Sequence, residues 1–238
     1  MRAGRDLTVL AVLVLAALFL PAVAARQARP AVLNLGPNDF DYVRGFREDW
    51  ERDRLTRFHW TTPHASIRLP LEVSGEGHRL SMRIRRHLIE PSKVTIRTED
   101  RIVSVFDIAA DPQVAYRTIV IDLPPLEGRR PFLLTIDSTS ADPRPLGIAI
   151  DWLQIERVSK DARFELLGAT RLALLILAII AFLAPRLAGA SLAAAAAHAA
   201  VVAAVMVAGC AWDILAAERI AREGWTVYVA AAGIAVLV

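Results

Sequence analysis

Long apolar segments constrain the folding of this chain more than any other feature of its sequence. One lies near the N-terminus at residues 7–25, and two more lie at residues 166–184 and 190–211, where charged side chains are rare. A helix of about 19 residues rises about 1.5 Å per residue and is long enough to cross the hydrocarbon core of a bilayer. The sequence therefore predicts a membrane protein, with the lipid bilayer as one of its partners. It predicts transmembrane helices at residues 166–184 and 190–211.

The N-terminal segment allows two interpretations. Arg2 and Arg5 precede its apolar stretch, and Pro21 with the small residues 22–24 follows. This three-part layout is typical of a cleaved signal peptide, but an uncleaved membrane anchor would look the same. In both interpretations residues 1–25 deliver the following segment across the bacterial cytoplasmic (inner) membrane. We expect residues 26–165 on the periplasmic or extracellular side.

The C-terminal end contains a connection and one more apolar segment. We expect residues 212–224 to form an external loop and residues 225–238 to begin a further transmembrane helix. Fourteen residues cover only about 21 Å, which is short for a complete span. The expectation is that this sequence is the front end of a longer polytopic protein, and a tilted, complete final helix is the alternative.

Charge and cysteine content exclude several classes of function. The net charge is only +3, so the chain lacks the strong basic field that nucleic-acid binding requires. The single cysteine, Cys210, cannot form an internal disulfide. The histidines and acidic residues show no metal-ligand spacing, so we expect neither a metal nor a cofactor. Among the 28 basic residues only Lys93 and Lys160 are lysines, a bias that suggests a bacterial genome.

Between the apolar segments the dominant periodicity is two. Leu80, Met82 and Ile84, for example, alternate with polar residues, as a strand with one buried face requires. Turn signals rich in Gly, Pro, Asn and Asp separate such runs. The fold class predicted is an all-β antiparallel sandwich, jelly-roll-like, at residues 26–160, together with transmembrane α-helices. The segment 47–54 is expected to be a short helix or a charged loop.

Three short motifs carry a resemblance to known modules: residues 35–39 (LGPND), 58–61 (FHWT) and 145–152 (PLGIAIDW). They resemble a β-sandwich module of bacterial polytopic membrane proteins related to C-type glycosyltransferases, which use lipid-phosphate sugars. The same region is similar to the galactose-binding-like jelly rolls of carbohydrate-binding modules. The resemblance implies a glycan or a lipid-linked sugar as a partner.

Aromatic side chains are candidates for sugar binding, because the apolar face of a pyranose can lie flat on a ring. Trp152 is in phase with Ile148 and Ile150, so it is expected in the core. A position in the core is also the alternative for the other large aromatic side chains, since a sandwich core needs bulky residues. The ligand-binding candidates are Trp50, Trp60, His59 and Tyr42.

Charged side chains are candidates for two further kinds of site, an anionic-surface contact and a catalytic base. Arg79, Arg83 and Arg85 could face an anionic surface, although a solvated strand face is the ordinary reason for such a run. The resemblance to C-type glycosyltransferases assigns an acidic base to the first external loop, and Asp213 is the position that matches. The alternative for this loop is an interfacial connection held by aromatic residues.

The sequence thus predicts a membrane-anchored envelope protein with an extracytoplasmic accessory sandwich that binds carbohydrate. It would form the N-terminal part of a glycosyltransferase-like polytopic protein. This chain by itself holds no assembled catalytic group, so a catalytic residue beyond the candidate Asp213 is not expected. The alternative is a structural module that assembles with envelope protein partners and binds no sugar.

Overall fold

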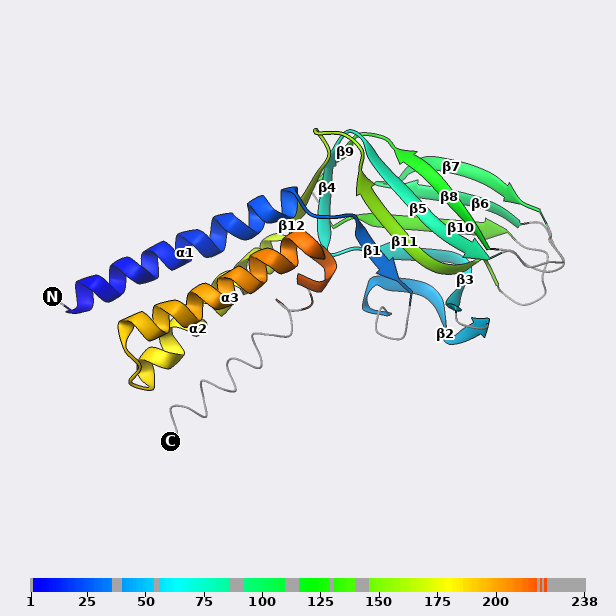
Figure 1. The fold of residues 1–238 in the computed structure, drawn as a ribbon. Coiled ribbons are helices and arrows are strands. Elements are labelled where there is room, and N and C mark those ends of the chain that lie inside the picture. The colour runs from blue at the N-terminus through cyan, green and yellow to red at the C-terminus, as the bar shows by residue number, and fades with distance from the viewer. Residues whose placement is uncertain are drawn as a thin grey trace. The chain divides into compact units, whose positions relative to one another are not determined.

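The computed structural model describes residues 2–35, 40–53, 56–85, 92–109, 116–128, 131–139, 146–217, 219 and 221, without the side chains of residues 2, 3, 40, 48–53, 56 and 57. Two compact units divide the chain: a helical unit within Met1–Arg29 and Phe164–Val238, and a sandwich unit, Pro30–Arg163. Figure 1 shows helices in the first unit and strands in the second. The predicted span at residues 225–238 lies outside the described residues.

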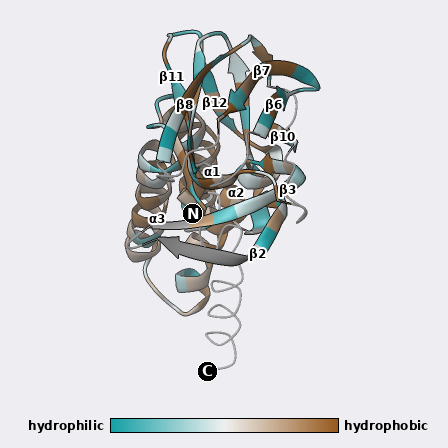
Figure 2. Ribbon diagram, turned by 90° about the vertical axis from the view of Figure 1, so that its right-hand side faces the viewer, coloured by the Kyte–Doolittle hydropathy of each residue, from teal (hydrophilic) through white to brown (hydrophobic). Residues whose placement is uncertain are grey.

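The helical unit contains α1 (Arg2–Arg26), α2 (Gly168–Leu187) and α3 (Leu192–Trp212). Each of these helices is long and apolar enough to cross a membrane. In Figure 2 hydrophilic colour is sparse on the helices, whereas hydrophilic and hydrophobic residues mix along the strands. Length and composition therefore fit the predicted association with a bilayer.

Small residues let the helices of this unit approach closely. Ala181 and Phe182 of α2 pack with Ala195 and Ala199 of α3, and apolar side chains of α1 cover the cluster. Nδ1 of His198 lies 2.7 Å from the carbonyl oxygen of Ala181, so this polar side chain has a partner inside the helix pair.

An ion pair joins two of the helices at one end of the unit. The Nη2 atom of Arg186 donates to Oδ2 of Asp6 at 2.9 Å, and both side chains are about one-third exposed. The pair brings Arg186 close to the basic N-terminus of α1.

The sandwich unit is built from antiparallel strands, and the last described strand of the chain belongs from Phe164 onward to the helical unit. Their bounds are β1 (Ala31–Asn34), β2 (Val43–Asp53, after the 3-10 turn η1, Phe40–Tyr42), β3 (Thr56–Arg68), β4 (Leu71–Gly75), β5 (His78–Arg85), β6 (Ser92–Thr98), β7 (Arg101–Ile108), β8 (Tyr116–Leu123), β9 (Leu126–Glu127), β10 (Leu133–Thr139), β11 (Ala149–Arg157) and β12 (Arg163–Leu166). Along the main sheet the order is β7-β6-β10-β3-β11-β5-β8, with β1 beside β11 and β2 beside β3. A short pair of β4 and β9 belongs to a second sheet. This arrangement confirms the predicted fold class.

The long strand β3 joins the two layers. Its first half pairs with β11 through Trp60 and His59, and its second half pairs with β10 from His64 to Arg68. One layer therefore contains β7, β6 and β10, and the other contains β11, β5 and β8. Pairing therefore places the two halves of β3 in different layers.

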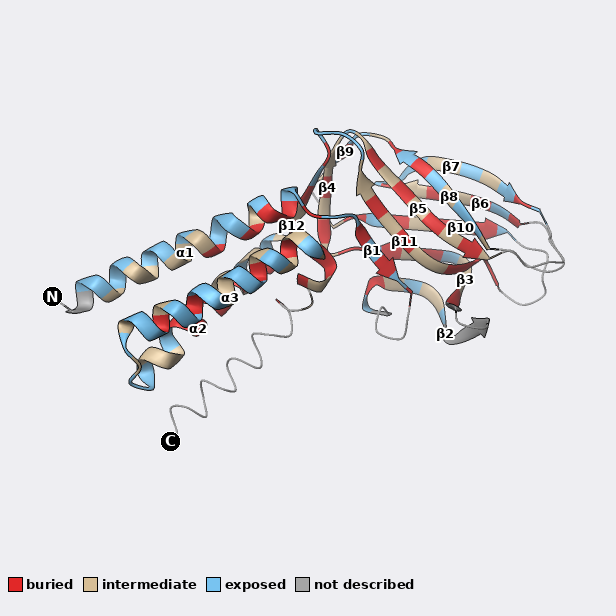
Figure 3. Cartoon of the chain, viewed as in Figure 1, coloured by how far each residue is buried: buried red, intermediate tan, exposed pale blue. Residues whose placement is uncertain are grey.

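The core lies between these layers and follows the predicted alternation. Leu80, Met82 and Ile84 of β5 are fully buried, as are Leu134 and Ile136 of β10. Red and lighter residues alternate along β5 and β11 in Figure 3. Within the described residues the only cysteine, Cys210, lies in a helix of the other unit, so burial of apolar side chains stabilises the sandwich.

Two local predictions are wrong. The segment expected as a helix or charged loop at residues 47–54 belongs largely to the strand β2, because it pairs with β3 from Trp50 to Asp53. Trp152 does not join the core. The register of β11 shifts between Ile150 and Trp152, so Trp152 is half-buried and Leu153 takes the core position. Such a bulge inserts one residue and reverses the phase of a strand.

His78, the first residue of β5, is a titratable group with no exposed surface. Burial lowers its pKa, and the positive charge of Arg157 adds to this effect, while hydrogen bonds with the backbone of Arg163 and Gly75 oppose it. The unfolded chain therefore takes up a proton near pH 6.5 that the folded domain accepts only at lower pH.

We expect the free energy of unfolding to fall as the pH is lowered from about 6.5 towards the folded pKa of His78. The change His78→Gln removes the titrating ring and should flatten this part of the profile. The check is denaturant unfolding of the full-length chain in detergent between pH 8 and pH 5. Parallel profiles for both proteins over this range would contradict the assignment.

Candidate functional site

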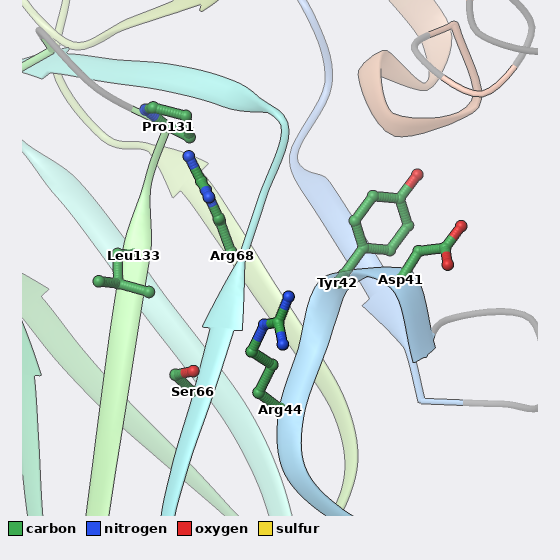
Figure 4. Close-up of a pocket in the computed structure, with 7 residues that line it drawn as sticks. All are labelled: Asp41, Tyr42, Arg44, Ser66, Arg68, Pro131 and Leu133. Atoms are coloured by element: carbon green, nitrogen blue, oxygen red, sulfur yellow. The ribbon is translucent and has the colours of Figure 1, made fainter.

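A cavity of about 430 Å³ opens on the solvent side of β3 and β10, where η1 and the start of β2 approach them. Figure 4 shows the side chains around it. The residues that line the cavity are Asp41, Tyr42, Arg44, Ser66, Arg68, Pro131 and Leu133. Its volume is within the range of about 300–1,000 Å³ that is usual for small-molecule sites.

Strand register explains why these residues meet. Ser66 and Arg68 alternate with Ile67, which is fully buried, so they lie on the solvent face of β3. Leu133 is paired with Arg68, and Arg44 is paired with Ser66. The neighbouring strands β10 and β2 therefore each place one side chain, Leu133 and Arg44, beside those on the solvent face of β3.

Tyr42 forms an aromatic wall of this cavity. It is the last residue of η1 and is 4% exposed. In Figure 4 its ring lies between the carboxylate of Asp41 and the guanidinium group of Arg44. Of the sequence-predicted ligand candidates whose side chains the structure describes, only Tyr42 lines the cavity.

The charges of the cavity are predominantly positive. Arg44 and Arg68 are exposed, and neither makes an ion pair within the described part of the chain. Sequence reasoning missed both residues because they are far apart in the chain and follow no motif spacing. Their position on strand faces beside a predicted aromatic candidate is the only signal that could have found them.

The other aromatic candidates lie elsewhere. His59 and Trp60 are consecutive on β3 and project to opposite faces. His59 is 2% exposed, with Nδ1 at 3.1 Å from the carbonyl oxygen of Arg47, while Trp60 packs edge to face with Phe58. The two rings therefore do not form one binding surface. The backbone of Trp50 pairs with His59, and its side chain lies outside the described residues.

The three predicted arginines share the solvent side of β5 and contact groups of the domain itself. Nε of Arg79 donates to Asp122 at 2.8 Å, and that hydrogen bond together with the carboxylate charge raises the pKa of Arg79. The guanidinium group of Arg85 lies 4.6 Å from the centroid of the Phe58 ring. The third, Arg83, is paired with a carboxylate on β11.

This carboxylate is Asp151, at the bulge of β11. Nη1 of Arg83 donates to its Oδ2 at 2.9 Å. Burial raises the pKa of Asp151, and the neighbouring guanidinium opposes that shift. The interaction explains why the polar residue is tolerated in a half-buried position: its charge is compensated by a partner on the adjacent strand.

Asp213 follows α3 directly and caps the next helical turn. Its Oδ1 accepts hydrogen bonds from the backbone N–H groups of Leu215 and Ala216 at 3.1 and 3.0 Å. Beside it, the ring of Trp212 lies 3.6 Å below the guanidinium carbon of Arg29. The carboxylate therefore has a structural role as a helix N-cap. In the described part of the chain no group of three His, Cys, Asp or Glu side chains is arranged to hold a metal.

Comparisons with known proteins concern the sandwich fold. No protein-family model matches the sequence, and no curated protein matches it either. Among solved structures, the chain is similar to the C-terminal family 6 carbohydrate-binding module of the LamC laminarinase from Zobellia galactanivorans. Sequence identity is 9% and the TM-score is 0.37, and the match covers 54% of this chain and 99% of that one.

A second such module belongs to Cellvibrio mixtus lichenase 5A and was solved with cellotriose. It has 12% identity and a TM-score of 0.39, with 54% of this chain and 98% of that chain covered. A family 35 module from Clostridium thermocellum has 13% identity and a TM-score of 0.34, with 55% and 100% covered. The class of this protein, an antiparallel β-sandwich joined to apolar helices, rests on its own strand pairing.

Proposed function

We propose that this protein is a membrane-anchored carbohydrate-binding protein, and that its sandwich unit binds a sugar in the cavity beside Tyr42. The observation that carries the proposal is the composition of this cavity. It combines an aromatic wall with a hydroxyl group, a carboxylate and two guanidinium groups in a volume of about 430 Å³. A pyranose needs both an apolar surface and groups that hold its hydroxyls.

Each kind of lining group has a part in this binding mode. The side chain of Leu133, which is 40% exposed, offers apolar surface to a face of the sugar, whereas Tyr42, which is 4% exposed, forms part of the cavity wall. Ser66 can donate and accept hydrogen bonds, Asp41 accepts them, and the guanidinium groups donate them. Sugar hydroxyls also both donate and accept, so a mixed set of partners suits them.

The helical unit supports the membrane part of the proposal. Three helices are long and apolar enough to span a bilayer. Such an anchor would hold the sandwich at the membrane surface, on the periplasmic or outer side, where envelope glycans and lipid-linked sugars occur. We further propose that the chain serves a glycosyltransferase-like polytopic protein, a context that rests on the sequence resemblance alone.

A glycan array probed with the full-length chain in lipid nanodiscs tests the proposal. The change Ser66→Phe should fill the cavity and abolish the glycan signals of the wild-type protein. The matched control is Ser81→Phe, at a half-buried serine on the solvent side of β5, in the other layer. This control should retain the signals. If the wild-type protein bound no glycan, the proposal would be wrong and an envelope-assembly module would be favoured.

A further inference from the structure

Two arginines line the candidate cavity without a carboxylate partner. Arg44 lies at the start of β2 and Arg68 is the last residue of β3. Both are exposed, and in the described part of the chain neither forms an ion pair. On the same solvent face Arg97 is paired with Asp137, which shows that this domain does neutralise other strand arginines.

The positive charge of the cavity is only partly compensated. Asp41 is the one acidic residue among the described residues that line it. In the view of Figure 4 its carboxylate lies on one side of the Tyr42 ring, whereas the side chains of Arg44 and Arg68 lie on the other side. One net positive charge therefore remains, and it is concentrated on the side where the two guanidinium groups lie.

Guanidinium chemistry indicates which ligand this arrangement would favour. Two like charges that line one cavity repel each other, and an anion placed between them removes the repulsion. The planar guanidinium group also matches carboxylate and phosphate oxygens with two parallel hydrogen bonds. Neutral sugars would use these donors only for hydroxyl groups, without the gain from opposite charge.

We propose that the ligand is an acidic sugar, whose ring lies against Leu133 and whose carboxylate or phosphate is bound by Arg44 and Arg68. This inference rests on the proposed function, because it names the substrate class of the same cavity. A uronic acid and a sugar phosphate share the required chemistry, a pyranose with an anionic substituent. The two sources are separated by the probes of the experiment.

The experiment measures binding to the full-length chain in nanodiscs of zwitterionic lipid. The probes are methyl glucuronide, glucose 1-phosphate and methyl glucoside. A charge-assisted hydrogen bond contributes about 1.5–3 kcal/mol, so at least one acidic probe should bind about 10- to 100-fold more tightly than the neutral one. Arg44→Gln and Arg68→Gln should each remove most of this preference, because each change lowers the affinity for the acidic probe more than the affinity for methyl glucoside. Arg101→Gln, at an exposed arginine of β7, is the matched control.

The outcomes separate this inference from the proposed function. If methyl glucoside binds as tightly as both acidic probes, and Ser66→Phe abolishes that binding, the inference is overturned while the proposed function stands. If inorganic phosphate binds as tightly as glucose 1-phosphate, and methyl glucuronide does not bind, the inference is also overturned, because the sugar ring contributes nothing. Failure of every sugar here and on the array overturns both.

Discussion

Replacing Gly45 with alanine is expected to destabilise the sandwich by about 2–5 kcal/mol. Gly45 has a φ of +70°, in the left-handed region, at the point where the register of β2 against β3 shifts. A Cβ atom there would overlap the carbonyl oxygen of His64 on β3. The left-handed conformation costs an L-residue roughly 1–2 kcal/mol, and forced overlap adds about 1–3 kcal/mol.

The Gly45→Ala change should also weaken binding in the cavity, because Arg44 is its neighbour in the chain. Hydrogen exchange of the full-length chain in nanodiscs measures the first effect, through faster exchange of the amides shared by β2 and β3. The control is Gly168→Ala, where a Cβ would meet nothing within 4 Å. Unchanged exchange in Gly45→Ala would show that the strand does not require the left-handed conformation.

The second large expected effect is a difference in stability between substitutions at two adjacent leucines of β10. Leu134 is fully buried between the layers, whereas Leu133 is 40% exposed on the solvent face. We expect Leu134→Ala to lower the free energy of unfolding by about 2–5 kcal/mol, since it removes apolar contacts and leaves a cavity in the core. Leu133→Ala should change it by less than about 0.5 kcal/mol, as is usual for exposed positions.

The pair is informative because residue type, strand and substitution are the same. Denaturant unfolding of the full-length chain in detergent, followed by a signal from the sandwich unit, measures both changes. Leu133 also lines the candidate cavity, so Leu133→Ala should reduce ligand affinity without loss of stability. Equal losses of stability in the two variants would contradict the assignment of the two faces of β10.

The two classes of segment were predictable from the sequence because their signals are local. Helices of the helical unit coincide with runs of apolar residues, and the buried positions of β5 follow the alternation that predicted them. The prediction for residues 47–54 was wrong for a physical reason. Its charged pattern has no strand periodicity of its own, and pairing with β3 makes it a strand. The prediction that Trp152 lies in the core was wrong for a different reason. A single inserted residue at the bulge of β11 reverses which side chains face the core.

The candidate site depended on information that no local pattern contains. Tyr42 was identified as an available ring, but the sequence assigned it no neighbours. Arg79 and Arg83 looked like an anionic-surface site, whereas the fold pairs each of them with an acidic residue of an adjacent strand. No sequence pattern identified Arg44 or Arg68 as a candidate. Strand register brings these two residues to one cavity.

The sequence by itself determined the division between apolar helices and a half-buried pleated domain, because hydrophobic length and periodicity act within one segment. The tertiary structure alone decided which arginines are neutralised and which remain available, because that depends on the residue placed opposite each one. Register and bulges set those pairings, and they are decided by packing between strands that are distant in the chain.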